Sequence, residues 1–233
     1  MNMKLVAVGG GAVAIALAIG AWASFSSGRI DPSVPAAVAA AQTAATPSGQ
    51  APQVATVPAG MVIEPTDRVL GNREAPVQII EYASLTCPHC ADYKANTFPE
   101  IKRNWIDTGR VRYVYRDFPL DQVALQASVI ARCAPEERYF PLLEALFQTQ
   151  GQWATASDPV AALRRIGRLS GMTEERMTEC LADQSLQEAV LRQRLGGAQT
   201  FAVSGTPTIL INGVAVRDRS YTAIDQALRQ VAR

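Results

Sequence analysis

The stretch VQIIEYASLTCPHC, residues 77–90, decides how the rest of the chain is interpreted. A short run rich in β-branched residues is typical of a buried strand, and here it leads to two cysteines at the start of a predicted helix. Residues three apart on a helix share a face, so Cys87 and Cys90 lie close enough to form a disulfide. The unpaired N–H groups and the dipole of a helix start favour thiolate at Cys87, the candidate nucleophile, with Cys90 as its resolving partner. Pro88 suits the first helical position because a backbone N–H there would have no helical partner.

Composition excludes several classes of function. The 233 residues carry a formal net charge of +1, which points to no polyanionic partner such as a nucleic acid. The one histidine of the chain is His89, inside the cysteine pair. A Ser-His-Asp triad or a histidine-rich metal site therefore has no other imidazole to use.

The first residues are typical of an export signal. Lys4 precedes an uncharged apolar run over residues 5–25. Two interpretations stay open for residues 1–25. Cleavage is supported by the small residues Ala21 and Ala23 around Trp22, and retention as a membrane anchor is supported by the length of the run. Lys4 on the cytoplasmic side agrees with the positive-inside rule in both.

Residues 26–61 have the composition of a flexible linker. They are rich in Ala, Pro, Gln, Ser, Thr and Val, carry almost no charge and show neither helical nor strand periodicity. A linker of this length would let an anchored periplasmic domain reach its substrates.

Residues 62–233 are predicted to fold. An edge strand near Val69, the buried strand, a helix over residues 87–106 and a strand over residues 111–116 form a βαβ unit. No convincing strand occurs between residues 121 and 202. Five helices are predicted there, over residues 121–134, 135–149, 158–169, 173–182 and 185–201.

The C-terminal part is predicted to add a hairpin and a helix. Residues 208–216 contain two apolar strands around Asn212-Gly213, a dipeptide that favours a tight hairpin turn. Ser220 is a candidate N-cap for a last amphipathic helix.

This order of elements resembles the thioredoxin fold, with a CxxC pair at a strand-to-helix junction and Thr206-Pro207 before the hairpin. The helical insertion, the dipeptide Pro88-His89 and the run GNREAPVQIIEY over residues 71–82 are similar to the DsbA family of periplasmic thiol:disulfide oxidoreductases. The resemblance covers roughly residues 69–231. It implies an α/β thioredoxin fold with an all-helical subdomain inserted at about residues 121–202.

Other roles for a CxxC pair fit less well. Zinc requires about four ligands, and neither His89 nor the distant cysteines can complete a site around Cys87 and Cys90. A haem attachment motif fails because Ala91 follows Cys90. The His89 side chain is either a solvated turn residue or a group that stabilises the Cys87 thiolate, which would make the disulfide a stronger oxidant.

Glu81 is an acid within an apolar strand, where burial is unfavourable unless the group is paired or functional. The DsbA resemblance matches it to a buried acid that moves protons at the resolving cysteine. The alternative is a glutamate that faces outward from the strand.

The resemblance implies that Thr206-Pro207 contains a cis-proline that faces the disulfide and holds the substrate backbone. The base rate of X-Pro bonds instead favours an ordinary trans turn. The best-known DsbA oxidase has valine where this chain has Thr206. Threonine is familiar at this place among isomerases, so the direction of catalysis stays open.

Cys133 and Cys180 lie in the predicted helical insert. In a reducing compartment they would be two buried thiols, whereas export favours a structural disulfide between them.

The resemblance implies an enzyme that introduces disulfides into reduced exported proteins by exchange through Cys87 and Cys90, without a metal or other cofactor. It would be a periplasmic monomer, soluble or tethered to the inner membrane, with a quinone-linked DsbB-type membrane partner that restores its disulfide. One alternative is an isomerase or reductase on the same fold. The other is a tethered peptide-binding or holdase module in which the Cys87–Cys90 disulfide is only structural.

Overall fold

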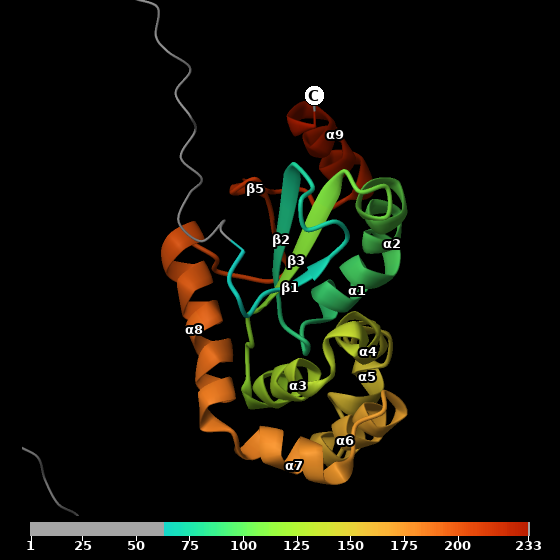
Figure 1. Cartoon of the computed structure of the whole chain (residues 1–233), viewed down its shortest axis with the longest axis vertical. Helices are drawn as coiled ribbons and strands as arrows, with labels where there is room; N and C mark the ends of the chain where they lie inside the picture. The colour runs from blue at the N-terminus through green and yellow to red at the C-terminus, as the bar shows by residue number, and fades with distance from the viewer. Residues whose placement is uncertain (1–62, 233) are drawn as a thin grey trace, which may run out of the picture. The chain divides into compact units, whose positions relative to one another are not determined.

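A mixed five-stranded sheet organises residues 63–232, the part of the chain that the computed structural model describes. The strand order is β1-β3-β2-β4-β5 (Figure 1). β2 pairs with β3 in parallel, and the other neighbouring strands are antiparallel. The strands are β1 (Arg68–Leu70), β2 (Val77–Ala83), β3 (Val111–Asp117), β4 (Thr208–Ile211) and β5 (Val214–Val216). The signal or anchor predicted for residues 1–25 and the linker predicted for residues 26–61 lie outside the described residues.

β2 is the central strand, and all seven of its residues are buried. Its side chains alternate between the two sheet faces, as the strand period requires. Ile79 and Ala83 belong to the larger hydrophobic core, and Ile80 and Tyr82 belong to a smaller core on the opposite face. The strand therefore positions the residues that follow it by packing on both sides.

Three consecutive helical segments and the C-terminal helix cover the larger core. They are α1 (Pro88–Asn96), α2 (Phe98–Ile101), the π-helical η1 (Lys102–Ile106) and α9 (Tyr221–Val231). The sequence predicts one helix over residues 87–106, and that prediction is wrong in its continuity. The helix breaks at Thr97, because Pro99 has no N–H to continue the hydrogen-bond ladder. Trp105 Nε1 donates to Asp225 Oδ1 at 2.9 Å and joins η1 to α9.

The predicted helical insertion is present between β3 and β4. It consists of α3 (Gln122–Cys133), α4 (Glu136–Gln148), α5 (Gln150–Trp153), α6 (Pro159–Leu169), α7 (Glu174–Ala182) and α8 (Gln184–Phe201). Side chains cap four of these helices at their N-termini, namely Asp121, Asp158, Thr173 and Asp183. The short helix α5 is not among the five predicted helices, since four residues are too few to show a helical period.

A disulfide joins Cys133 at the end of α3 to Cys180 in α7, as the sequence predicts for an exported protein. Their Cα atoms are 6.2 Å apart and the bridge closes a separation of 47 residues. Both residues are buried within the larger core. The bond therefore ties two helices of the insert together.

The C-terminal hairpin also agrees with the prediction. Asn212 and Gly213 both have positive φ, which the tight turn between β4 and β5 requires. Asn212 Oδ1 also accepts the backbone N–H of Gln78 at 2.9 Å and fastens the turn to β2. Within residues 63–232, no helix is both long enough and apolar enough to cross a membrane.

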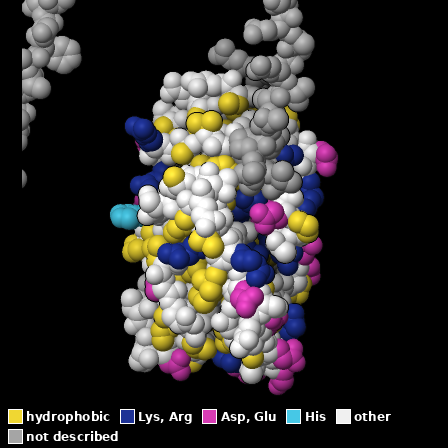
Figure 2. All heavy atoms as spheres, turned by 90° about the vertical axis from the view of Figure 1, so that its left-hand side faces the viewer, with side chains coloured by type: hydrophobic (Ala, Val, Ile, Leu, Met, Phe, Trp, Pro, Cys, Tyr) yellow, Lys and Arg dark blue, Asp and Glu magenta, His cyan; other side chains and the backbone are white. Residues whose placement is uncertain are grey.

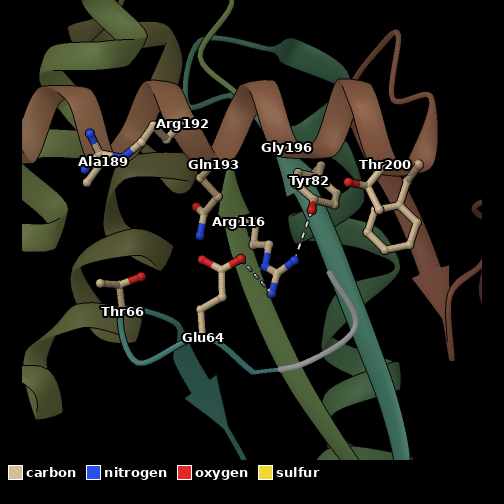
Figure 3. Close-up of a pocket in the computed structure, with 10 residues that line it drawn as sticks. Glu64, Thr66, Tyr82, Arg116, Ala189, Arg192, Gln193, Gly196 and Thr200 are labelled. Carbon is tan, nitrogen blue, oxygen red and sulfur yellow. Dashed lines mark hydrogen bonds and ion pairs between the residues drawn. The ribbon is translucent and has the colours of Figure 1, made fainter. Parts of the chain in front are cut away.

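On the face covered by α8, a buried polar network joins the N-terminal loop, the sheet and the helix. Arg116 of β3 donates to Asp67 Oδ2 at 2.7 Å and to the hydroxyl of Tyr82 at 3.1 Å. Gln193 of α8 donates to Asp67 Oδ1 at 3.1 Å and accepts the backbone N–H of Asp117 at 2.7 Å. Arg116, Tyr82 and Gln193 line part of a pocket of about 330 Å³ between α8 and the sheet (Figure 3). On the outer surface of this side, charged side chains of both signs lie among small hydrophobic groups (Figure 2).

Two adjacent glycines of α8 give a test of this packing. A Cβ on Gly197 would lie 2.5 Å from a ring carbon of Tyr82, whereas a Cβ on Gly196 would meet nothing within 4 Å. We expect Gly197→Ala to lower the free energy of unfolding by about 1–3 kcal/mol through overpacking. Gly196→Ala should raise it by up to about 1 kcal/mol through helix propensity. Urea unfolding of both variants measures the difference, and equal midpoints would contradict the close contact with Tyr82.

Candidate active site

Cys87 lies at the junction between the sheet and α1. It is the N-cap residue of α1, with an extended backbone, and Pro88 occupies the first helical position. Cys87 and Cys90 are free thiols in the structure. The Cys87 side chain retains 5% of its exposure and Cys90 retains none, so Cys87 is the member of the pair that a second molecule can reach.

The surroundings of Cys87 favour its thiolate. A hydrogen bond from the Cys90 side chain contributes most to lowering the pKa of Cys87, to about 5, while burial acts in the opposite direction. The backbone N–H groups of Cys90 and His89 lower the pKa further. Both N–H groups belong to the first turn of α1, where the dipole of the helix favours an anion. The Cys90 N–H also donates to the Cys87 carbonyl at 3.0 Å.

Cys90 has the opposite character. Burial is the main cause that raises its pKa, and the neighbouring Cys87 and the charge of Glu81 raise it further. Cys90 therefore stays a protonated thiol at pH values where Cys87 is ionised. The two sulfurs are chemically unequal, with a stabilised anion at the slightly exposed Cys87 and a neutral thiol at the fully buried Cys90.

Glu81 points into the larger core, so the alternative of an outward-facing strand glutamate is wrong. Its side chain is fully buried on β2. Glu81 Oε2 accepts hydrogen bonds from Lys94 Nζ at 2.7 Å and from the Tyr113 hydroxyl at 2.6 Å. The other oxygen, Oε1, has no hydrogen-bond partner among the described residues. A buried carboxyl group with one oxygen anchored and one without a hydrogen bond is thus near enough to Cys90 for its charge to act on that thiol.

Lys94 and Tyr113 are site residues that the sequence did not single out. Lys94 lies on α1, four residues after Cys90 and on the same side of the helix. Its pKa is lowered by burial, with the charge of Glu81 acting in the opposite direction. Lys94 also borders a pocket of about 740 Å³ between α1 and α4. The helical spacing from Cys90 was the signal that could have identified it.

The peptide bond between Thr206 and Pro207 is cis, the geometry that the resemblance implied. The backbone carbonyl of Thr206 accepts a hydrogen bond from Cys87 Sγ at 3.4 Å. Arg219 donates to the carbonyl of Pro207 at 3.0 Å. The segment before β4 is therefore held directly opposite the nucleophile candidate.

The backbone of His89, and not its side chain, contacts the Cys87 site. The residue is exposed, and within residues 63–232 no hydrogen bond of its imidazole is recorded. Its backbone N–H contributes to the stabilisation of Cys87 instead. A role for the His89 imidazole charge stays a prediction. Among the described residues, no three His, Cys, Asp or Glu side chains converge as a metal site would require.

Comparison with known proteins agrees with this geometry. Residues 64–230 match a family model described as thioredoxin. A protein of Rickettsia bellii (strain RML369-C) named as a protein-disulfide oxidoreductase is 34% identical over 180 residues, covering 77% of this chain and 70% of that protein. A protein of the same name from Rickettsia felis is 33% identical over 184 residues. The match covers 77% of this chain and 66% of that protein. Across five such Rickettsia proteins, the chain spans 62% to 70% of their length.

Solved structures share the overall fold of this chain. The crystal structure of Wolbachia pipientis alpha-DsbA1 matches with a TM-score of 0.70 and 28% identity, over 74% of this chain and 94% of that one. BdbD from Bacillus subtilis shares the fold, with a TM-score of 0.65 and 20% identity. The match covers 72% of this chain and 93% of that one. The sheet and the helical insertion thus belong to a fold that this chain shares with both solved structures.

The low pKa of Cys87 predicts a particular pH dependence. In the reduced protein, the ultraviolet absorbance of thiolate should rise with a midpoint near pH 5 and not near the ordinary value of 9.0. Because the folded pKa is depressed, ionisation stabilises the reduced fold fully above about pH 9, and this stabilisation is lost as pH falls through about 5. Cys90 does not contribute over this range because its pKa is raised.

Two measurements check this dependence. The reduced form should lose stability relative to the oxidised form between pH 9 and pH 5, the interval between the two pKa values of Cys87. Cys87→Ser should remove both the absorbance step and the pH-dependent difference in stability. A midpoint near pH 9 in the wild type would contradict the stabilised thiolate.

Proposed function

The chain belongs to the thioredoxin-fold family of DsbA-type protein-disulfide oxidoreductases, and we propose that it donates disulfide bonds to reduced proteins. Membership of this family makes it an enzyme of thiol–disulfide exchange that acts on substrate proteins. We assign the role of nucleophile and leaving group to Cys87, and that of resolving thiol to Cys90.

The inequality of the two thiols supports donation over reduction. In the oxidised enzyme, a substrate thiolate attacks Cys87 Sγ, the Cys87–Cys90 bond breaks, and Cys90 leaves and takes up a proton. A second substrate thiolate then attacks the substrate sulfur of the mixed disulfide and releases Cys87 as a thiolate. A thiol with a low pKa leaves readily, and a stabilised reduced enzyme makes the starting disulfide a stronger oxidant.

We propose that Glu81 moves the proton that Cys90 takes up or releases. Its charge already acts on Cys90, and its Oε1 carries no hydrogen bond from the described residues. Lys94 and Tyr113 hold Oε2 and thereby fix the orientation of the carboxylate.

We propose that Thr206 and Pro207 bind the backbone of the substrate next to its cysteine. The cis bond presents this segment beside Cys87, and Arg219 holds it from behind. Thr206 is also the feature that favours the second candidate function, disulfide isomerisation or reduction, because threonine at this place is familiar in isomerases of the fold.

We further propose a location outside the cytoplasm, with exported proteins as substrates. Residues 5–25 have the composition of an export signal or anchor, and the Cys133–Cys180 disulfide suits an oxidising compartment. In the periplasm the enzyme would be a monomer, soluble or tethered to the inner membrane. A quinone-linked DsbB-type partner would take two electrons from the reduced pair and restore the Cys87–Cys90 disulfide, and the Cys90 thiol would release the one proton that the pair holds when Cys87 is ionised.

The reduction potential of the Cys87–Cys90 pair distinguishes the candidates. For a donor of disulfides, equilibration with glutathione should give a value closer to that of DsbA, about −120 mV, than to that of thioredoxin, about −270 mV. A value near that of thioredoxin would overturn donation in favour of reduction. Cys87→Ser should abolish both disulfide donation and insulin reduction, whereas a peptide-binding or holdase module would keep its function in this variant.

The role of Glu81 has its own test. Glu81→Gln removes the proton-carrying group and keeps the size of the side chain. We expect the mixed disulfide with a model peptide to decay about a hundredfold more slowly, which is the low end of the contribution of positioned acid–base groups. Glu137→Gln makes the same change at an exposed position and should leave the rate unaltered. Quenching the reaction at set times and measuring the mixed disulfide by mass spectrometry gives this rate. A rate in Glu81→Gln equal to that of the wild type would remove Glu81 from the mechanism.

A further inference from the structure

Gln150 reaches from the helical insert into the loop that carries the cysteines. It is the first residue of α5, and its side chain is buried, with 7% of its surface exposed. The amide Nε2 donates to the carbonyl of Leu85 at 2.8 Å and to the carbonyl of Cys87 at 3.0 Å. Both protons of one side-chain amide are thus used by the backbone on either side of Thr86.

The carbonyl of Cys87 is also the acceptor that starts α1. It accepts the backbone N–H of Cys90 at 3.0 Å and that of Ala91 at 3.2 Å. Gln150 adds a third donor to this oxygen, from outside the helix. The position of this carbonyl sets the position of the first turn, whose N–H groups stabilise the Cys87 thiolate.

A second contact from the insert holds the same loop from another side. The Thr86 hydroxyl donates to Asp121 Oδ2 at 2.6 Å, and Asp121 Oδ1 caps α3 by accepting the N–H of Ala124 at 2.7 Å. This pair is exposed, whereas the bonds of Gln150 are buried. Buried hydrogen bonds are the less replaceable of the two, because water cannot take the place of the lost donor.

We propose that Gln150 is a positioning residue for the exchange reaction, which holds the Cys87 carbonyl so that the first turn of α1 stays aimed at Cys87 Sγ. This role rests on the proposed function of Cys87 as nucleophile. Gln150 does not touch the sulfur and acts through the backbone of Cys87. The helical insert thereby controls the reactivity of a cysteine that belongs to the thioredoxin-fold part of the chain.

The chemistry of the side chain explains why an amide suits this position. Two carbonyl oxygens need two donors, and a neutral amide supplies both without adding charge. Glutamate would supply no donor when ionised and would place a negative charge near the Cys87 thiolate. Methionine has a similar length and supplies no N–H donor.

The test measures the thiolate of Cys87 in the full-length reduced protein. Gln150→Met should raise the pKa of Cys87 by about one unit, a tenfold loss of thiolate at pH values below the midpoint. Gln150→Glu should raise it further because it adds repulsion. Gln152→Met makes the same change at an exposed position of α5 and should leave the pKa unaltered.

Other readouts separate positioning from a structural role. If Gln150 only stabilised the fold, Gln150→Met would lower the thermal midpoint and leave the Cys87 pKa and the reduction potential at wild-type values, which would overturn the proposal. Gln150→Asn is a milder change, because it keeps the amide on a shorter side chain that does not reach both carbonyls. The pKa of Cys87 should rise in this variant too. A wild-type pKa in both Gln150→Met and Gln150→Asn would also overturn the proposal.

Failure of the proposed function would look different. Activity retained in Cys87→Ser would show that Cys87 is not the nucleophile, while the effect of Gln150 on the Cys87 pKa would still be measured.

Discussion

One carbonyl oxygen, that of Cys87, is the point where the sheet, the first turn of α1 and the helical insert meet. It accepts two N–H groups of α1 and the side-chain amide of Gln150. Since β2 is buried on both faces, the loop that follows it has little freedom, and Pro88 begins the helix at once. The cis bond before Pro207 then brings a second backbone segment against the sulfur. The surroundings of Cys87 therefore combine fixed backbone groups with the Cys90 side chain, which contributes most to lowering the Cys87 pKa.

Behind this point lies a buried ion pair, which is an unfavourable element unless its geometry is good and its remaining groups are bonded. Glu81 and Lys94 meet this condition in part, through their mutual contact and the Tyr113 hydroxyl. Apolar side chains in place of this ion pair would avoid the free-energy cost of removing two charges from water. Glu81 acts electrostatically on Cys90, and its Oε1 has no hydrogen-bond partner among the described residues, so both observations support the proton-transfer role that we propose for it.

The parts of the site that could be predicted from sequence are those set by neighbouring residues. The CPHC turn, the buried strand and the Asn212-Gly213 hairpin depend on local preferences, and the burial of Glu81 follows from its apolar neighbours. Lys94 had a local signal only in its helical spacing from Cys90, whereas its contact with Glu81, 13 residues away, had none. Gln150 could not be predicted, because its partner Cys87 lies 63 residues away and long polar side chains are usually exposed. The break at Thr97 had a local signal in Pro99, whereas α5 is too short to leave any.

The Cys133–Cys180 disulfide makes the protein a member of the class of molecules on which we propose that it acts. Under the proposed function, a new copy would need an oxidant before its α3 and α7 are joined, and a mature copy with an oxidised Cys87–Cys90 pair would supply it. Maturation would then be autocatalytic, with each finished molecule increasing the rate at which the next is completed. After a reducing episode, recovery would begin slowly and accelerate as the pool of folded enzyme grows.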